Sequence, residues 1–204
     1  SQGEVYETVT TYDDAMHALV VTDPRGTRTR RELDGLDRVV RDVVDVDGLG
    51  LETRTTWDGL SNRTSSRDPE QHQTESTYDA WGRLRQVKDA LGRTTLYTYD
   101  GGGLRTSETD RRGVRTEMTH DNLGRLLRTS ITPSLTAVPW STSTAYLDQA
   151  RRRVETDPRG KDTATELDRL GRPVRVVGAD GEETRTEWLG IHDRRERDRN
   201  GFWR

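Results

Sequence analysis

Four histidines are the side chains best suited to acid–base or metal chemistry in this sequence, and they are widely separated. They are His17, His72, His120 and His192, and no cysteine accompanies them. Without cysteine, disulfides and thiolate metal sites are excluded. Catalysis or metal binding would need these groups to converge with carboxylates, and their spacing matches no ligand or catalytic motif. We therefore predict that the chain is not an enzyme and has no catalytic, metal-binding or cofactor-binding residues.

The other groups that could do chemistry are better explained as turns. Carboxylates are paired at residues 13–14 and 182–183, and three glycines stand together at residues 101–103. The glycines follow a predicted strand, but neither a helix nor a lysine comes next, so they do not form a phosphate-binding loop. Asp-Pro-Arg-Gly occurs at residues 23–26 and 157–160, with proline at the second position that a type I turn favours.

The composition predicts a folded chain with a thin core. Only 29% of the 204 residues are hydrophobic, 34% are charged, and the mean hydropathy is −1.00. Such a balance is typical of disorder, because too little apolar surface offsets the entropy of ordering. The tyrosines and tryptophans nevertheless recur at fixed spacing, which a disordered segment has no reason to do. The net charge of −3 comes from interleaved acids and bases, so we expect no nucleic-acid partner, and no apolar run is long enough to span a membrane.

Nearly all the basic residues are arginines, because Lys88 and Lys161 are the two lysines among 33. The planar guanidinium suits ladders of Asp and Glu partners on a sheet face. A compositional bias of a GC-rich bacterial genome is the alternative explanation.

One phrase repeats along the chain with a period of 21 residues. Taking the Tyr of Tyr-Asp as the anchor, six of the eight gaps between anchors are 21 residues long. The nine anchors are Tyr12, Leu33, Trp57, Tyr78, Tyr99, His120, Tyr146, Leu167 and Trp188. A threonine stands four residues before every anchor, at Thr8, Thr29, Thr53, Thr74, Thr95, Thr116, Thr142, Thr163 and Thr184. His120 therefore occupies an anchor position, and we interpret it as a packed repeat residue.

Two turn signals divide each unit. Asp-x-x-Gly follows the anchor and recurs mid-unit, which is typical of short strands joined by tight turns. Between the turns, Thr95, Tyr97 and Tyr99 alternate onto one face. We predict an all-β, repetitive antiparallel meander with about two short strands per unit, forming a curved wall segment of a larger shell. Residues 1–204 form a single array of about nine units, with a loop insertion near 132–140 and a degenerate unit at 189–204.

The repetition has a physical reason, because a single hairpin of this kind is marginal in water. Its anchor is buried only if the neighbouring unit covers it, which is worth roughly 1.5–3 kcal/mol for each large side chain. We expect aromatic to stack on aromatic along one face, with stability supplied by nearest neighbours. Since the chain begins at Ser1 and its last unit departs from the pattern, we also expect an array truncated at both ends.

The units resemble YD repeats, also called Rhs repeats. The sequence YDAWGRLRQVKDALGRTTLYTYD at residues 78–100 fits the pattern YDxxGRLxxxxDxxGxxTxxxYD at every landmark. The resemblance implies a spiral β-shell of the kind found in bacterial Rhs polymorphic toxins and in the C components of insecticidal toxin complexes. It implies as partners the remaining repeats of the shell, an enclosed C-terminal toxin domain, and components of a secretion system or cell surface. It also implies a protein that is secreted or delivered by a bacterial secretion system.

Two functions follow as hypotheses. The first is a structural shell segment that encloses a toxin passenger for delivery. The alternative is a repeat module that binds glycans or a cell surface. For the alternative, Trp81, Trp140 and Trp203 are the candidate exposed contacts, because they lie off the anchor positions.

Overall fold

A computed structural model describes residues 7–133, 138–189 and 194–197. The chain divides into two compact units, Ser1–Tyr97 and Thr98–Arg204, and each is described by itself. Both are all-β and antiparallel, which confirms the predicted fold class. The one short helix described is the 3₁₀ turn η1 (Asp148–Ala150), and no helix in the described residues has the length and apolar character to cross a membrane.

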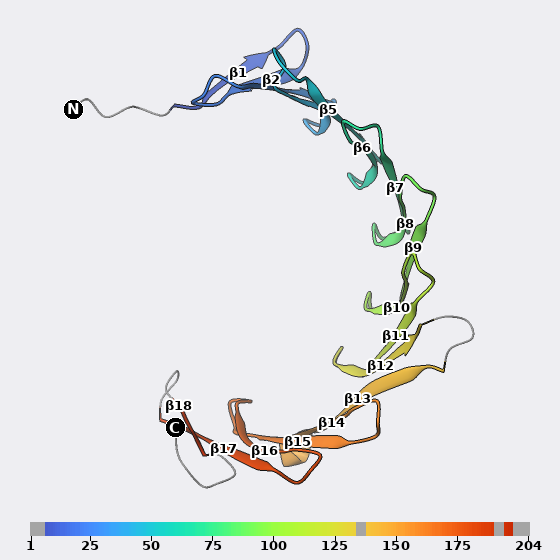
Figure 1. The fold of residues 1–204 in the computed structure, drawn as a ribbon, viewed down its shortest axis with the longest axis vertical. Helices are drawn as coiled ribbons and strands as arrows, with labels where there is room; N and C mark the ends of the chain where they lie inside the picture. Colours follow the sequence, from blue (N-terminus) through green and yellow to red (C-terminus); the bar gives the residue numbers. More distant parts are fainter. Residues whose placement is uncertain (1–6, 134–137, 190–193, 198–204) are drawn as a thin grey trace, which may run out of the picture. The chain divides into compact units, whose positions relative to one another are not determined.

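The first unit is a meander in which each strand pairs with the next (Figure 1). Its strands are β1 (Val9–Asp13), β2 (Ala18–Thr22), β3 (Arg28–Leu33), β4 (Val39–Val44), β5 (Leu51–Trp57), β6 (Arg63–Arg67), β7 (Gln73–Tyr78), β8 (Leu84–Lys88) and β9 (Thr94–Tyr99), whose last two residues belong to the second unit.

The second unit repeats the same antiparallel pairing between sequence neighbours. Its further strands are β10 (Arg105–Thr109), β11 (Arg115–His120), β12 (Leu126–Thr132), β13 (Trp140–Leu147), β14 (Arg152–Thr156), β15 (Asp162–Leu167), β16 (Pro173–Val177), β17 (Glu183–Trp188) and β18 (Arg194–Arg197).

Burial alternates along the anchor strands as a period of two requires. In β7, Thr74, Ser76 and Tyr78 are half-buried while the residues between them are exposed, and β11 has the same pattern. We call the side that carries the anchors the anchor face and the other side the ladder face. In five strand pairs the register shifts by one residue immediately before an anchor, for example between Thr77 and Tyr78. Such a bulge re-aims the side chain that follows it.

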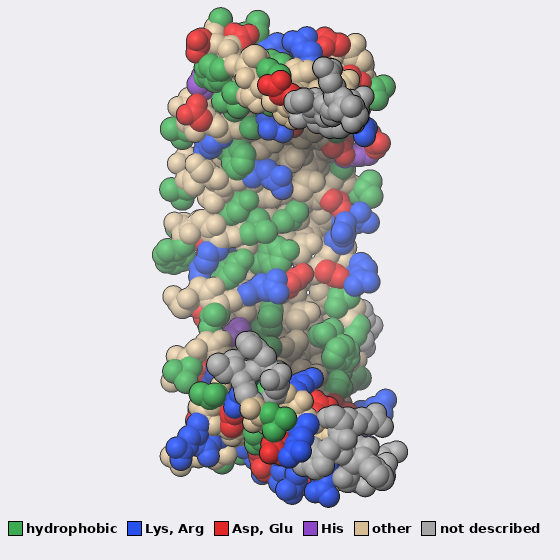
Figure 2. All heavy atoms as spheres, turned by 90° about the vertical axis from the view of Figure 1, so that its left-hand side faces the viewer, with side chains coloured by type: hydrophobic (Ala, Val, Ile, Leu, Met, Phe, Trp, Pro, Cys, Tyr) green, Lys and Arg blue, Asp and Glu red, His purple; other side chains and the backbone are tan. Residues whose placement is uncertain are grey.

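The hydrophobic core is minimal in both units. Among the described residues the buried hydrophobic side chains are Ala18, Val43 and Ala164, and no large side chain is fully buried. Each unit is a single layer of strands in the described residues, with no second sheet or helix packed on it (Figure 1). Figure 2 shows hydrophobic and charged side chains interspersed with exposed backbone and small polar groups on one face. Stability must therefore come from turns and cross-strand contacts.

Ion-pair ladders run across the ladder face in both units. In the first, the Arg41 guanidinium donates to Glu32 at 2.8 Å and to Glu52 at 2.6 Å. In the second, Arg175 donates to Glu166 and to Glu183, each at 2.9 Å. These are the arginine–acid ladders that the arginine-rich composition predicts. Exposed pairs of this kind contribute about 0–1 kcal/mol each.

Candidate functional site

Ten of the described turns are each closed by one aspartate through four local hydrogen bonds. The Asp79 N–H donates to the Arg83 carbonyl at 2.9 Å, and the Gly82 N–H donates to the Asp79 carbonyl at 3.0 Å. The Asp79 carboxylate accepts from the N–H groups of Trp81 at 2.9 Å and Arg83 at 3.0 Å. The same four bonds recur at Asp23, Asp34, Asp58, Asp89, Asp100, Asp110, Asp121, Asp157 and Asp168. Eight of these ten turns have the predicted Asp-x-x-Gly sequence, whereas Asp37 and Ser61 take the glycine position in the other two. The predicted turn at Asp47–Gly50 is not formed, because the Gly50 N–H donates to the Asp45 carbonyl at 2.8 Å.

These contacts favour the charged carboxylates. The Arg38 guanidinium, aided by two backbone N–H groups, lowers the pKa of Asp34 to about 2. The backbone N–H of Arg172 and its side chain likewise lower the pKa of Asp168. On the ladder face, Arg175 and then Arg185 lower the pKa of Glu183 to about 2.

The arginine that ends a turn covers the anchor of the following unit. Arg125 donates to Asp121 of its own turn at 2.7 Å, and its guanidinium lies 4.2 Å from the centre of the Tyr146 ring. Arg172 lies over Trp188 at 4.7 Å and Arg38 over Trp57 at 5.8 Å. Cation–π contacts of this kind are worth about 0.5–1 kcal/mol at exposed sites. At these three anchors an arginine, rather than the aromatic ring expected from the sequence, provides the cover.

The polar tip of an anchor also reaches back to the preceding strand. The Tyr78 hydroxyl donates to the Arg63 carbonyl at 2.9 Å. The indole N–H groups of Trp57 and Trp188 donate to the carbonyls of Val39 and Pro173, also at 2.9 Å. Each ring thus bridges two strands of its sheet.

The remaining predicted anchors occupy equivalent strand ends. Tyr99, His120 and Tyr146 are half-buried on the anchor face, and the His120 Nδ1 is buried without a hydrogen-bond partner among the described residues. Tyr12 is more exposed, and its hydroxyl lies 2.7 Å from the His17 Nδ1.

The repeat threonines occupy one position per unit but differ in burial. Thr8 precedes β1 and is exposed, as are Thr142 and Thr184. The half-buried members are Thr29, Thr53, Thr74, Thr95, Thr116 and Thr163. Threonines just before an anchor, Thr56 and Thr98, instead place their hydroxyls against hydroxyls of the next strand. Thr98 lies 2.9 Å from the Thr106 hydroxyl and 2.7 Å from that of Ser107, a pairing that sequence reasoning missed.

The histidines are used as local partners. His17 lies 3.2 Å from the Asp37 carboxylate, and His72 lies 3.2 Å from that of Asp68. In the described part of the chain no three His, Asp or Glu side chains are grouped to hold a metal ion. His192 lies outside the described residues.

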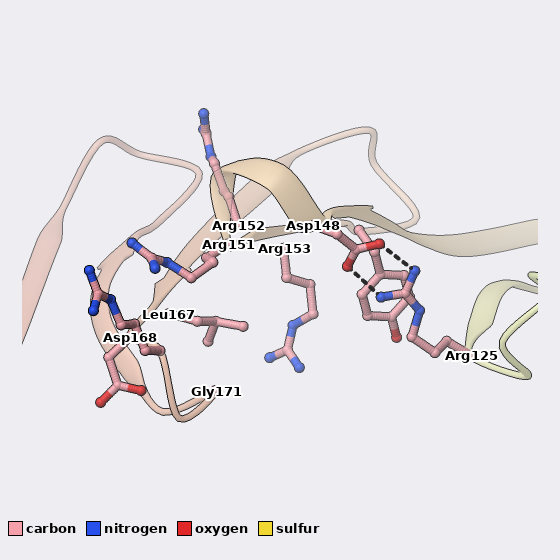
Figure 3. A pocket seen from close by; sticks show the side chains of 10 residues that line it. Arg125, Asp148, Arg151, Arg152, Arg153, Leu167, Asp168 and Gly171 are labelled. Carbon is pink, nitrogen blue, oxygen red and sulfur yellow. Dashed lines mark hydrogen bonds and ion pairs between the residues drawn. The ribbon is translucent and has the colours of Figure 1, made fainter.

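A cavity of about 360 Å³ opens on the anchor face of the second unit, at Tyr146, Arg153 and Leu167. Tyr146 and Arg153 are cross-strand partners on β13 and β14, and the Leu167 N–H on β15 donates to the Arg151 carbonyl at 2.8 Å. On the other side, Arg125 is bidentate to Asp148, at 2.6 and 2.9 Å (Figure 3). Five arginines and two aspartates are among the lining residues.

A family model described as RHS Repeat matches residues 78–115, the segment in which the anchor, turn and strand landmarks are most regular. Residues 78–115 are therefore an Rhs-repeat segment. No curated protein sequence matches the chain.

Solved structures share the fold of this chain at low sequence identity. The crystal structure of TcdB2-TccC3 aligns with a TM-score of 0.58 and 12% identity over 98% of this chain. The Photorhabdus luminescens Tc holotoxin pore with the TccC3-D651A mutation aligns at 0.56 and 12% over 97%, and TcdB2-TccC3-Cdc42 at 0.55 and 11% over 97%. The chain spans only 13–15% of the length of these proteins.

The tryptophans that lie off the anchor positions differ in environment. Trp81 is 79% exposed at a turn tip, with the Arg83 guanidinium 4.8 Å from its ring. Trp140 begins β13 and is 42% exposed, while Trp203 lies outside the described residues. Leu60 and Leu123 occupy the same turn position as Trp81 and are also exposed.

Proposed function

We propose that this chain is a wall segment of an Rhs shell whose function is to enclose and shield a toxin passenger until delivery. The observation that carries the proposal is the single layer of strands in each unit, in which the buried hydrophobic side chains of the described residues are only Ala18, Val43 and Ala164. A wall needs this property, because its stability must be distributed along its length rather than concentrated at one centre. The shared fold with TcdB2-TccC3 supports it.

The proposal assigns this segment no catalytic step. The acids that could do chemistry are engaged by turn N–H groups and arginines, which hold them ionised as structural acceptors. The partners of the segment are then further repeats of the same shell and the enclosed toxin domain. The protein that carries them is secreted or delivered by a bacterial secretion system.

The test uses the complete gene product that contains this segment. We expect cryo-electron microscopy to show a hollow particle, and added protease to spare the passenger until the shell is denatured. The double variant Tyr78→Ala, Tyr99→Ala removes two half-buried anchors and should make the passenger sensitive. The matched control, Leu91→Ala with Leu123→Ala, removes two exposed turn residues and should keep it protected. A passenger cleaved in the intact protein as fast as when free would refute the proposal.

A glycan-binding role is the second candidate, and the exposure of Trp81 favours it. Its ring, at the tip of a turn, is of the kind that stacks on sugars, although Arg83 covers one side. A glycan array should then show saturable binding that Trp81→Ala abolishes. Leu123→Ala, at the equivalent turn position and 75% exposed, is the control. Equal binding by both variants would argue against this role.

A further inference from the structure

The cavity in the second unit lies beside Leu167, which stands at an anchor position. Elsewhere an anchor ring reaches back to a carbonyl of the preceding strand, as Trp188 does to Pro173. Counted back by the same 15 residues from Leu167, that carbonyl belongs to Arg152. Leucine has neither the length nor the donor to reach it, and the space that a ring would fill remains open (Figure 3).

Five arginines and two aspartates line this space, and both aspartates pair with arginines: Asp148 with Arg125, and Asp168 with Arg172. Figure 3 shows the Arg153 side chain extending between Leu167 and Arg125, whereas Arg152 points away. The Arg153 Nε is buried and makes no hydrogen bond among the described residues, although it forms a long ion pair with Glu155 at 3.6 Å. Buried donors are almost always satisfied in proteins, so a missing partner points to a ligand or solvent.

The turn acid that could neutralise the cluster is already engaged. Asp148 follows the anchor Tyr146 by two residues, but its carboxylate accepts both nitrogens of the Arg125 guanidinium. Arg125 in turn lies over the Tyr146 ring and completes one wall. Within the described residues no carboxylate forms an ion pair with Arg151, which lines the rim.

The equivalent hairpin of the first unit, 134 residues earlier, provides an internal control. There His17 takes the place of Arg151 and closes the space, with its ring bonded to Tyr12 at 2.7 Å and to the Asp34 carbonyl at 2.9 Å. Asp37, which lies 3.2 Å from His17, is replaced by Gly171 in the second unit. Leu19 is replaced by Arg153. All three differences open the second site or make it more cationic.

We propose that this cavity binds a tetrahedral oxyanion, a phosphate or sulfate group carried on a small molecule of about the size of one sugar. Guanidinium forks match the geometry of such oxygens and bind them through charge-assisted hydrogen bonds. A bare ion would leave much of the 360 Å³ empty, whereas the volume lies near the lower end of the ~300–1,000 Å³ typical of small-molecule sites. Arg153 holds the oxyanion, and Leu167 and Tyr146 contact the body of the ligand.

Calorimetric titration of the full chain tests this proposal, with glucose, glucose 6-phosphate and glucose 6-sulfate as probes. We expect one or both esters to bind saturably and glucose not to bind. Arg153→Leu installs the residue that stands at the equivalent position of the first unit and should weaken binding about tenfold or more, as loss of a charged hydrogen bond predicts. Arg159→Leu removes the same charge from an exposed mid-unit turn and should change affinity less than about twofold.

Comparing the affinities of glucose 6-phosphate and glucose 6-sulfate shows whether the cavity prefers a phosphorylated or a sulfated ligand. Leu167→Trp fills the cavity and should abolish binding while the chain remains folded by circular dichroism. Failure of both esters to bind, or equal binding by Arg153→Leu and Arg159→Leu, would overturn the proposal. Neither outcome bears on whether the chain is a shell wall, because the enclosure test does not depend on this cavity.

Discussion

The hairpins that end in Leu33 and Leu167 have the same construction but differ in what lies beside the leucine. In both, the residue before the second strand has a left-handed backbone, with φ of 46° at His17 and at Arg151. Its carbonyl accepts the N–H of the leucine, at 3.0 Å for Leu33 and 2.8 Å for Leu167. The first unit closes the space with an imidazole, and the second leaves it open and lined with arginine.

The turns therefore set the backbone of a repeat unit, while the side chains beside the anchor position can differ between units. Both copies continue into the same ladder, with Arg41 and Arg175 each joining two glutamates. The two hairpins therefore share their backbone and their ion-pair ladder, and differ in whether the space beside the anchor leucine is filled.

Lowering the pH should reduce the folding stability more than any substitution below, and it should do so in both units. Asp34 in the first unit and Glu183 in the second have pKa values of about 2, below the ordinary values of 3.8 and 4.5. Because folding lowers these values, the stability they contribute is present above about pH 4.5 and is lost as the pH falls toward 2. Thermal unfolding followed by circular dichroism at pH 7, 4, 3 and 2 should show a falling midpoint over the last three. An unchanged midpoint between pH 4 and pH 2 would contradict the role of the turn and ladder carboxylates.

Replacing the anchor leucine with tryptophan should change the stability of the two hairpins in opposite directions. Leu167→Trp places a ring in open space and should stabilise the fold by about 1.5–3 kcal/mol. Leu33→Trp must compete with His17 and should destabilise it by about 1–3 kcal/mol through overpacking. Urea unfolding of both variants measures the difference. If the two substitutions have the same sign, the two spaces are not closed and open forms of one site.

Removing the turn arginine should destabilise both hairpins. Arg38→Ala and Arg172→Ala each break an ion pair with the turn aspartate and a contact with the next anchor, Trp57 or Trp188. Arg38→Ala also removes hydrogen bonds to the Asp58 carbonyl and the Ser61 hydroxyl. We expect a loss of about 1–2 kcal/mol in each case from these exposed contacts together. Arg159→Ala, whose turn lies away from any anchor, is the control in urea unfolding. A loss no larger than the control's would show that the arginine does not stabilise the anchor.

The smallest effect concerns the fourth residue of the turn that follows each leucine. Asp37 has a φ of 59° and Gly171 a φ of 77°, a region in which glycine is less strained. Asp37→Gly should therefore gain up to about 1 kcal/mol from the backbone, reduced by loss of the His17 contact. Gly171→Asp should lose about the same amount and should also supply Arg151 with a carboxylate. Unfolding free energies of opposite sign check this, and ester binding by Gly171→Asp should weaken.

The sequence predicted the features that depend on local chemistry. Aspartate and glycine three residues apart predicted the turns, and the alternation of Thr95, Tyr97 and Tyr99 predicted the face they share, because both depend on neighbours within a few residues. The period of 21 predicted the pairing of consecutive strands.

The side-chain contacts of the anchors and the cavity beside Leu167 could not be predicted from local sequence. That Arg125 covers Tyr146 depends on how far a turn reaches across the sheet, which spacing alone does not give. A leucine at position 167 reads as a conservative filling of an anchor position, and its consequence emerges only once the rings elsewhere are seen to span two strands. The exchange of His17 for Arg151 is recognisable only when residues 134 apart are aligned, a much longer period than the one that defines the unit.

Each of the ten aspartate-closed turns makes its four bonds within five consecutive residues, and this bears on how such a chain can change over generations. Recombination that deletes or duplicates whole units would leave every such turn intact, since none relies on a distant partner. The match between the Leu33 and Leu167 hairpins is what copying of a block of several units would leave behind. The number of repeat units can therefore change between generations while the hydrogen bonds within each of these turns are kept.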